Sequence, residues 1–227
     1  GQKIVICGPS GSGKSTISRL LFRFYDVDQG RITIDGQDIR DVSQLSLRKA
    51  IGVVPQDTVL FNDTIAYNIH YGNPEAPWEQ VQEAAQLAQI HGFVESLPKG
   101  YETEVGERGL KLSGGEKQRV AIARTILKGP RILIFDEATS ALDSHTEKEI
   151  QESLREVSKE RTTLIVAHRL STIIGADEIL VLRQGEIMER GRHEELLKLG
   201  GEYSEMWKKQ QKSEAQEQQA SSIENQP

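Results

Sequence analysis

Short apolar runs alternate with amphipathic stretches along most of the chain. Residues 3–7, Lys-Ile-Val-Ile-Cys, are the first apolar run, and their number and β-branched content predict a buried strand. Residues 14–25 follow with apolar side chains at helical spacing, which predicts a helix. By the same criteria we expect strands at 31–35, 51–54, 131–136 and 162–167, a hairpin of 179–182 with 186–190 around Gln184-Gly185, and helices at 45–50, 146–157 and 203–210.

The pattern changes between residues 62 and 128. Strand-like runs nearly vanish there, and long amphipathic helices are predicted at 78–90 and 113–128. Strands and helices alternate before and after this stretch, which predicts a mostly parallel sheet flanked by helices on both faces. We therefore expect an α/β fold with a core of residues 1–61 and 129–211 and an inserted α-helical subdomain at about 62–128.

Composition and charge narrow the class of protein. The 227 residues carry a net charge of -6, so a general attraction to nucleic acid is not expected. The single cysteine, Cys7, lies in an apolar run, which favours a buried core residue and implies no internal disulfide. No apolar run approaches the roughly 20 residues that span a bilayer. The start, Gly-Gln-Lys, has no initiator Met and no signal-peptide pattern, so we expect a piece of a longer protein.

The last segment has a different composition. Residues 212–227 are rich in Gln, Glu and Ser and hold one large apolar residue, Ile223. Such a segment buries too little apolar surface to offset the entropy cost of ordering it. We therefore expect a disordered tail.

A glycine-rich segment follows the first predicted strand. Residues 8–15, Gly-Pro-Ser-Gly-Ser-Gly-Lys-Ser, match G-x-x-x-x-G-K-[ST], the phosphate-binding P-loop. Glycines let successive backbone N–H groups turn towards phosphate oxygens, and the next helix directs its positive end to the same place. In this motif the lysine, Lys14, reaches the β- and γ-phosphates, and the hydroxyl of Ser15 ligates Mg²⁺. The residues expected to bind nucleotide are Gly8, Pro9, Ser10, Gly11, Ser12, Gly13, Lys14, Ser15 and Thr16.

Two carboxylates follow a later apolar run. Asp136 ends the predicted strand Ile-Leu-Ile-Phe-Asp, and Glu137 is the next residue. The carboxyl ends of strands are where ligands bind in open α/β folds, so Asp136 is placed to hold Mg²⁺ directly or through water. Glu137 can aim elsewhere, at an attacking water, and is the candidate general base. A positioned base contributes about 10²–10⁴ in rate.

The residues Leu-Ser-Gly-Gly-Glu at 112–116 have the pattern of a helix start. Ser113 can cap the helix, and Glu116, three residues later, completes a capping box. Two glycines directly after the cap, Gly114 and Gly115, weaken a helix unless another group must approach its backbone closely. A γ-phosphate at this helix N-terminus would supply that reason.

With the P-loop before them and the acidic strand end after them, residues 112–116 resemble the signature motif of ABC transporters. The resemblance covers residues 1 to about 211, and three further elements follow in the family's order. Gln56, after Val-Val-Pro, is similar to the Q-loop glutamine, and His168 is similar to the switch histidine. The D-loop is matched by Ser140, Ala141, Leu142 and Asp143.

The resemblance implies an ATPase with ATP and Mg²⁺ as its cofactors. Two such domains sandwich two ATP molecules head to tail, each bound by the P-loop of one copy and by the signature helix start of the other. The residues implied to contact the nucleotide bound by the other copy are Ser113, Gly114, Gly115 and Glu116. Catalysis is implied for Lys14, Gln56, Glu137 and His168, and Mg²⁺ binding for Ser15, Gln56 and Asp136.

A narrower resemblance is to exporters. Residues 103–109 look like the exporter X-loop, in which Glu107 and Arg108 are suited to contact an intracellular coupling helix. Further matches to a half-transporter branch, which contains mitochondrial iron–sulfur-related, heavy-metal-tolerance and porphyrin-associated transporters, lie at residues 22–26, 52–58, 61–65 and 109–112.

That branch implies a fused transmembrane domain, a homodimer and a cargo that is glutathione-linked, metal-related or porphyrin-related. It also implies an organelle membrane, first the mitochondrial inner membrane with this domain in the matrix. Vacuolar, endolysosomal and bacterial inner membranes are the alternatives.

One feature departs from the family. Its members usually stack adenine on an aromatic residue well upstream of the P-loop, a contact worth about 1–3 kcal/mol. This chain begins seven residues before Gly8, so we expect that aromatic residue and the first strands to be missing and ATP binding by the chain to be weak.

Two other classes of protein remain open at this point. A soluble ABC ATPase of DNA repair or translation is disfavoured by the acidic charge and the exporter-like loop. A non-hydrolysing regulatory module is disfavoured by the presence of Glu137 and His168.

Overall fold

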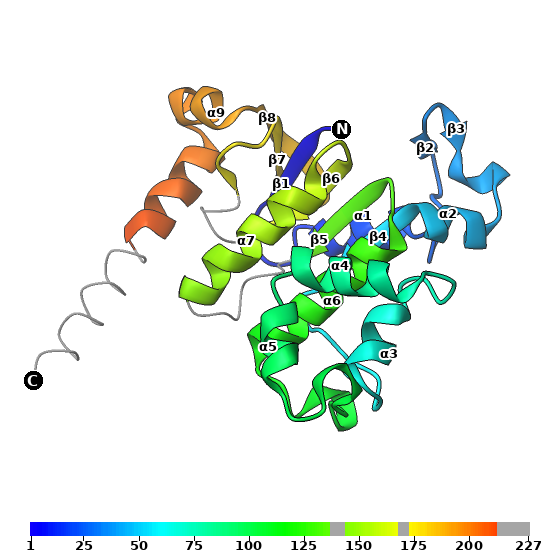
Figure 1. The fold of residues 1–227 in the computed structure, drawn as a ribbon. Coiled ribbons are helices and arrows are strands. Elements are labelled where there is room, and N and C mark those ends of the chain that lie inside the picture. The colour runs from blue at the N-terminus through cyan, green and yellow to red at the C-terminus, as the bar shows by residue number, and fades with distance from the viewer. Residues whose placement is uncertain (137–143, 168–172, 213–227) are drawn as a thin grey trace, which may run out of the picture. The chain divides into compact units, whose positions relative to one another are not determined.

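The computed structural model describes residues 1–136, 144–167 and 173–212 (Figure 1). The chain divides into two compact units. The first unit comprises Gly1–Gln2 and Ser15–Leu164, and the second comprises Lys3–Lys14 and Ile165–Pro227. The predicted disordered tail lies outside the described residues, except for residue 212.

The first unit contains parallel strands. Strand β4 (Ile51–Val54) pairs in parallel with β5 (Ile132–Asp136). The N–H of Thr162, the first residue of β6 (Thr162–Val166), donates to the carbonyl of Arg131 at 3.3 Å and thereby aligns β6 beside β5. Both predicted apolar runs are therefore buried strands, and the core between them and the neighbouring helix consists of Ile39, Leu47, Ile51 and Ile134.

Residues 62–128, where the sequence pattern changes, are mostly helical. Helices α3 (Ile65–His70), α4 (Trp78–Leu87), α5 (His91–Ser96) and α6 (Gly114–Lys128) pack against one another (Figure 1). Two 3-10 turns, Gly100–Glu102 and Glu107–Gly109, lie between α5 and α6. Within residues 62–128, all of which are described, the only strand-like feature is an isolated bridge of Thr64 with Glu104. The helical content is confirmed, while the division into a core and an insert stays a prediction.

The rest of the first unit holds shorter elements. The hairpin of β2 (Thr33–Ile34) and β3 (Gln37–Asp38) turns at Asp35 and Gly36, whose φ angles are 51° and 81°. Two successive positive φ angles are typical of a type I′ turn, which suits Asp-Gly. The strand predicted at 31–35 is thus shortened to two residues, because the turn already begins at Asp35. Helices α1 (Lys14–Leu21), α2 (Gln44–Ala50) and α7 (Ser144–Ser158) and the 3-10 turn Ile39–Asp41 complete the order.

The second unit is built around β1 (Lys3–Cys7). This strand pairs in parallel with β7 (Glu178–Arg183), and β7 forms an antiparallel hairpin with β8 (Glu186–Gly191). The N–H of Ala167 donates to the carbonyl of Ile6 at 3.1 Å, so the end of β6 lies on the other side of β1. Among the described residues the pairs β4–β5 and β1–β7 are parallel and only β7–β8 is antiparallel, so the strands are mostly parallel, as predicted. Helix α9 (His193–Leu199) and a helix at 202–212 follow.

Two helices end earlier than the sequence predicted. Helix α1 stops at Leu21 and α4 at Leu87, although apolar residues continued the helical pattern to Tyr25 and Ile90. In each case a left-handed residue ends the helix, Arg23 with φ 51° and Gln89 with φ 55°. The N–H of the left-handed residue donates to the carbonyl three residues earlier, and the N–H of the next residue donates to the carbonyl five residues before itself. This pair of hydrogen bonds is the Schellman motif.

Glycine is required at position 52 by the packing of α6 against β4. A Cβ at Gly52 would lie 2.6 Å from Cγ of Pro130 and 2.8 Å from Cγ2 of Thr125. We expect Gly52→Ala to lower the free energy of unfolding by about 1–3 kcal/mol, because the added methyl group overpacks the interface. Urea unfolding followed by circular dichroism measures this.

The matched control is Gly92→Ala in α5, where a Cβ would meet no described atom within 4 Å. This change is expected to leave stability unchanged or to raise it by up to about 1 kcal/mol, because alanine favours a helix more than glycine does. Equal destabilisation by both changes would contradict the packing explanation.

Candidate functional site

The P-loop lies in the second unit, directly after the buried strand β1. Gly8 has φ 150°, and a Cβ there would lie only 2.2 Å from the carbonyl oxygen of Leu182 on β7. Gly11 and Gly13 have φ angles of 78° and 104°, a conformation that side chains rarely adopt. The glycine spacing of the motif is therefore required by backbone geometry.

The hairpin turn after β7 supports the P-loop. The N–H of Gly185 donates to the carbonyl of Ser12 at 2.9 Å, and the N–H of Ser12 donates to the carbonyl of Pro9 at 3.2 Å. The sequence predicted this hairpin but not its contact with the loop. The Gln184-Gly185 turn in the sequence predicts a hairpin. It does not predict a contact with the P-loop, which lies about 170 residues earlier in the sequence.

Two polar side chains of the loop fit a phosphate ligand. Lys14 is 6% exposed, and its ammonium donates to the carbonyls of Gly8 at 2.9 Å and Pro9 at 3.0 Å. The hydroxyl of Ser12, a residue that is 2% exposed, has no hydrogen-bond partner among the residues that the structure describes. A buried hydroxyl of this kind normally has a partner, and a phosphate oxygen would supply one. The residues present therefore fit the triphosphate of a nucleotide.

The cysteine before the loop is a core residue, as predicted. Cys7 is 1% exposed, and its thiol lies 3.8 Å from the carbonyl of Leu180. Burial raises the pKa of the Cys7 thiol to about 12, although the charge of Lys14 acts in the opposite direction. The neutral thiol is thus the stable form throughout the physiological range, and Cys7 is a packing residue rather than a nucleophile.

The start of α6 is a capped and exposed helix tip in the first unit. The N–H of Ser113 donates to Oε2 of Glu116 at 2.7 Å, and the N–H of Glu116 donates to Oγ of Ser113 at 3.3 Å. The predicted capping box is therefore confirmed. Ser113 and Gly114 are exposed and Gly115 is buried, so the tip presents backbone N–H groups and a hydroxyl at the surface. Such a tip can bind an anion.

The remaining predicted residues that the structure describes lie at the ends of first-unit elements. Gln56 is exposed, two residues after β4, and Asp136 is partly exposed as the last residue of β5. Ser15 and Thr16 are exposed in the first turn of α1. The hydroxyl, amide and carboxylate oxygens of Ser15, Gln56 and Asp136 are ligands of the kind that Mg²⁺ prefers. Glu137, Ser140, Ala141, Leu142, Asp143 and His168 lie outside the described residues.

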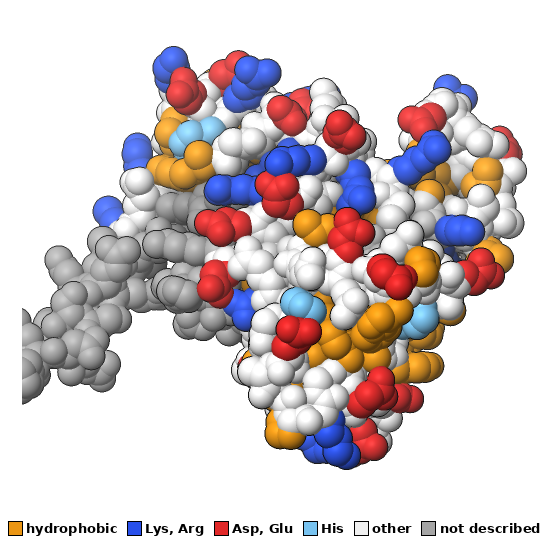
Figure 2. Space-filling model, viewed as in Figure 1, with side chains coloured by type: hydrophobic (Ala, Val, Ile, Leu, Met, Phe, Trp, Pro, Cys, Tyr) orange, Lys and Arg blue, Asp and Glu red, His pale blue; other side chains and the backbone are white. Residues whose placement is uncertain are grey.

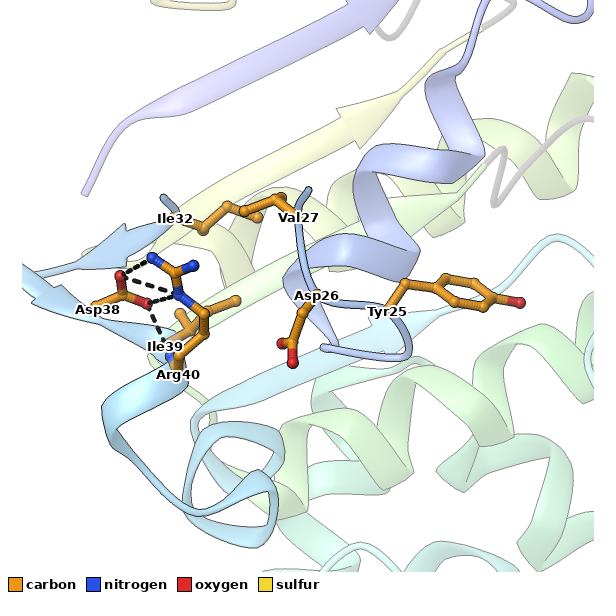
Figure 3. Close-up of a pocket in the computed structure, with 7 residues that line it drawn as sticks. All are labelled: Tyr25, Asp26, Val27, Ile32, Asp38, Ile39 and Arg40. Carbon is orange, nitrogen blue, oxygen red and sulfur yellow. Dashed lines mark hydrogen bonds and ion pairs between the residues drawn. The ribbon is translucent and has the colours of Figure 1, made fainter. Parts of the chain in front are cut away.

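A shallow hollow of the first unit contains none of the predicted site residues. It is open to solvent and is lined by residues 25–27, which follow α1, by Ile32, and by residues 38–40 at the end of β3 (Figure 3). Within it Arg40 donates to the carboxylate of Asp38 at 2.8 Å, and these hydrogen bonds lower the pKa of Asp38 to about 2. The ring of Tyr25 points away from this pair (Figure 3). The charges in the hollow are thus already paired.

An exposed aromatic patch lies on α3 of the first unit. Phe61, Tyr67 and Tyr71 are 42%, 45% and 53% exposed, and the rings of Phe61 and Tyr71 are 4.5 Å apart. The guanidinium of Arg124 lies 5.4 Å from the Phe61 ring and is held by the carbonyl and side-chain oxygens of Asn68, both at 2.8 Å. Figure 2 shows apolar side chains gathered over α3, with acidic and basic side chains interspersed around them. Large contiguous apolar patches on a protein surface are typical of interaction sites.

The loop with Glu107 and Arg108 adjoins this patch. Both side chains are exposed, and Arg108 has φ 50°. The N–H of Val105 donates to the carbonyl of Asp63, and the N–H of Ile65 donates to the carbonyl of Thr103, both at 3.0 Å. These bonds fix residues 103–109 beside the start of α3.

Comparison with known families identifies the family to which these motifs belong. The family model described as ABC transporter matches residues 1–140 of the chain. This chain belongs to the ABC transporter family. Its ATPase-domain motifs are those described above, and none of the helices in the described part of the chain has the length and apolarity to span a bilayer.

Individual relatives lie in a narrow branch of the ABC transporters. The chain is 65% identical to "ATP-binding cassette sub-family B member 6" of Mesocricetus auratus over 94% of this chain and 25% of that protein. It is 61% identical to "Iron-sulfur clusters transporter atm1, mitochondrial" of Aspergillus fumigatus, over 96% of this chain and 30% of that protein. It is 62% identical to the "ATM1-type heavy metal exporter" of Novosphingobium aromaticivorans, over 92% of this chain and 34% of that protein. The chain thus spans about a quarter to a third of the length of these relatives.

A solved structure agrees with these matches. A bacterial Atm1-family ABC exporter with ATP bound superimposes with a TM-score of 0.88 at 62% sequence identity. The match covers 92% of this chain and 36% of that one. The predicted fold class, a mostly parallel sheet flanked by helices in an ABC ATPase domain, is therefore confirmed.

The burial of Cys7 predicts low thiol reactivity. A pKa of about 12 leaves about 10⁻⁴ of the thiol ionised at pH 8, whereas a thiol near its ordinary value of 9.0 is about one-tenth ionised. We expect labelling of the folded chain by a disulfide reagent at pH 8 to be at least about 10³-fold slower than labelling in concentrated urea. The chain has one cysteine, so the signal is unambiguous. Rates within tenfold of each other would contradict the described burial.

Proposed function

We propose that this ABC ATPase domain binds and hydrolyses ATP and drives export by a half-transporter that works as a homodimer. The observation that carries the proposal is the P-loop itself, with Gly8 pressed against the Leu182 carbonyl, Lys14 held over the loop and the Ser12 hydroxyl unpartnered among described residues. Because these features are seen in this chain's own residues, they support phosphate binding independently of the family match.

Each predicted residue has a role in this reaction. Lys14 would bind the β- and γ-phosphates, and the peptide N–H groups of residues 8–15 would surround them. Glu137 would accept a proton from the attacking water, while Gln56 and His168 would orient that water and the γ-phosphate. The ligands proposed for Mg²⁺ are Ser15, Gln56 and Asp136. When bound, the ion neutralises charge that develops on the phosphate oxygens.

The tip of α6 supports the proposed second copy. Its N-terminus, with Ser113 and Gly114, is exposed and directs N–H groups outward, so it is available to a phosphate bound by another chain. Two identical copies arranged head to tail would complete two equivalent sites, because each chain contributes a P-loop to one and a helix tip to the other.

A fused transmembrane domain is the second proposed partner. The patch of Phe61, Tyr67 and Tyr71 and the adjoining loop with Glu107 and Arg108 give an aromatic surface bordered by charges, which suits a coupling helix. The names of the relatives support a cargo that is glutathione-linked, metal-related or porphyrin-related. They also support a mitochondrial inner membrane with this domain in the matrix, with vacuolar, endolysosomal and bacterial membranes as alternatives.

Loss of the P-loop lysine tests the phosphate site. We expect Lys14→Ala to lower kcat/KM for ATP hydrolysis by about 10²–10³-fold, because an electrostatic contact to the transferring phosphate is removed. The matched control is Lys49→Ala, a lysine exposed on α2, which is expected to retain full activity. A steady-state phosphate-release assay measures both variants. Equal activity of the two would refute the assigned site.

Mixing two inactive variants tests the head-to-tail arrangement. Lys14→Ala removes the P-loop contact, and Ser113→Arg blocks the helix tip with a bulky side chain. Each variant alone is expected to be inactive, but a mixture should recover activity, because a mixed dimer has one site with both parts intact. Phosphate release by the mixture, compared with the sum of the separate proteins, is the measurement, with melting temperatures as the folding control. A mixture no more active than that sum would argue against sites shared between copies.

A further inference from the structure

Strand β4 has outward-facing carbonyl groups that no other strand in the described part of the chain covers. It is a terminal strand, and it pairs with β5 on its inner side. The carbonyl of Ala50 accepts from the N–H of Arg131 on that inner side at 3.0 Å. Carbonyl directions alternate along a strand, so those of Ile51, Val53 and Pro55 face the other way. Groups of this kind need partners when a helix covers them.

Helix α6 supplies the partners from side chains on one face. The ammonium of Lys128 donates to the carbonyl of Ile51 at 2.7 Å. The hydroxyl of Thr125 lies 3.3 Å from the carbonyl oxygen of Val53. The amide of Gln118 donates to the carbonyl of Pro55 at 3.2 Å.

The spacings of helix and strand match. From Gln118 to Lys128, ten residues along the helix, the rise is about 15 Å. From Ile51 to Pro55, four residues along the strand direction, the distance is about 13 Å. The helix therefore runs alongside the strand, and side chains at three positions along it approach the outward-facing carbonyls.

Gln118 makes a second contact on the far side of Gln56. Its Oε1 accepts a hydrogen bond from the hydroxyl of Thr58 at 2.7 Å, and the residue is only 3% exposed. One buried amide thus binds the carbonyl of the residue before Gln56 and the side chain two residues after it. Gln56 itself is exposed, and it lies between the two residues, Pro55 and Thr58, that this amide binds.

We propose that Gln118 is a positioning residue for the Q-loop and couples the signature helix to Gln56. The inference rests on the proposed function, in which Gln56 acts at the Mg²⁺ and the attacking water. Gln118 is the fifth residue after the cap Ser113, about 7.5 Å along the helix from the tip. A displacement of α6 at its tip therefore reaches the Q-loop backbone through one rigid helix and two hydrogen bonds. Misplacement of a reacting group by about 1 Å can cost as much as 10²-fold in rate.

A pair of identical substitutions tests the positioning role in the full-length protein. Thr58→Val removes the hydroxyl that holds Gln118 near the Q-loop, and Thr125→Val removes a hydroxyl from the same helix–strand interface farther from it. We expect Thr58→Val to lower kcat by about tenfold and to raise the Mg²⁺ concentration for half-maximal activity, with KM for ATP unchanged. Thr125→Val should keep kcat and the Mg²⁺ dependence within twofold. Identical kinetics of the two variants would overturn the inference.

A double-mutant cycle separates this inference from the proposed function. Gln118→Met keeps the side-chain length without the amide, and we expect the same loss of kcat as in Thr58→Val. In a Gln56→Ala background, Gln118→Met should have no further effect, because it acts through Gln56.

The outcomes of this cycle distinguish the two proposals. Activity lowered by Gln56→Ala and lowered again, additively, by Gln118→Met would overturn the positioning role alone. Activity unchanged by Gln56→Ala would overturn the role of the Q-loop in the proposed function and the inference with it. Melting temperatures identify variants that do not fold, and Thr58→Val carries the test if Gln118→Met is one of them.

Discussion

The hydrogen bonds between α6 and the outer carbonyls of β4 are the contact on which most of the first unit depends. A terminal strand presents unpaired polar groups, and here Lys128 and Gln118 of one helix donate to the carbonyls of Ile51 and of Pro55, the residue after the strand. The hydroxyl of Thr125, which donates to the carbonyl of Ala121 at 2.9 Å, lies 3.3 Å from the carbonyl oxygen of Val53. The same helix packs against α3 and α4 and begins at the capped Ser113. Its position therefore determines the location of the helical elements, the exposed tip and the backbone around Gln56 together.

A different constraint shapes the second unit. The P-loop backbone passes so close to the Leu182 carbonyl that Gly8 has no room for a side chain, and the β7–β8 turn binds the loop through Gly185. The loop is thus supported by peptide groups rather than by apolar side chains. Supported in this way, its N–H groups can surround phosphate oxygens with little reorganisation, which is the form of preorganisation that phosphoryl transfer requires.

The family membership and the local geometry support the proposal in different ways. Relatives of 61% to 65% identity establish which family the chain belongs to, but they are three to four times as long as it is. The chemistry argued here uses groups present in this chain, namely Lys14, the capped tip of α6 and the Q-loop. Cargo selection and membrane coupling concern surfaces of the longer proteins, for which the aromatic patch on α3 is this chain's contribution to the proposal.

The sequence by itself determined the features that arise from neighbouring residues. Buried strands were evident from short apolar runs, the β7–β8 turn from Gln184-Gly185, the helix cap from Ser113 and Glu116, and the phosphate loop from its glycines. These features depend on local backbone preferences, so a local pattern is sufficient to predict them. The helix ends at Arg23 and Gln89 were missed, because a left-handed residue other than glycine leaves no compositional sign.

Only the tertiary structure decided which distant groups meet. Gln118 and Pro55 are 63 residues apart in sequence. Gly8 directly follows β1, and Leu182 lies on β7, near the other end of the chain. Their contacts follow from the packing of α6 along a terminal strand and from the pairing of β1 with β7. Apolar periodicity specifies which face of an element is buried, but it does not specify the element that covers it. The supporting contacts of the site therefore could not be predicted from the sequence alone.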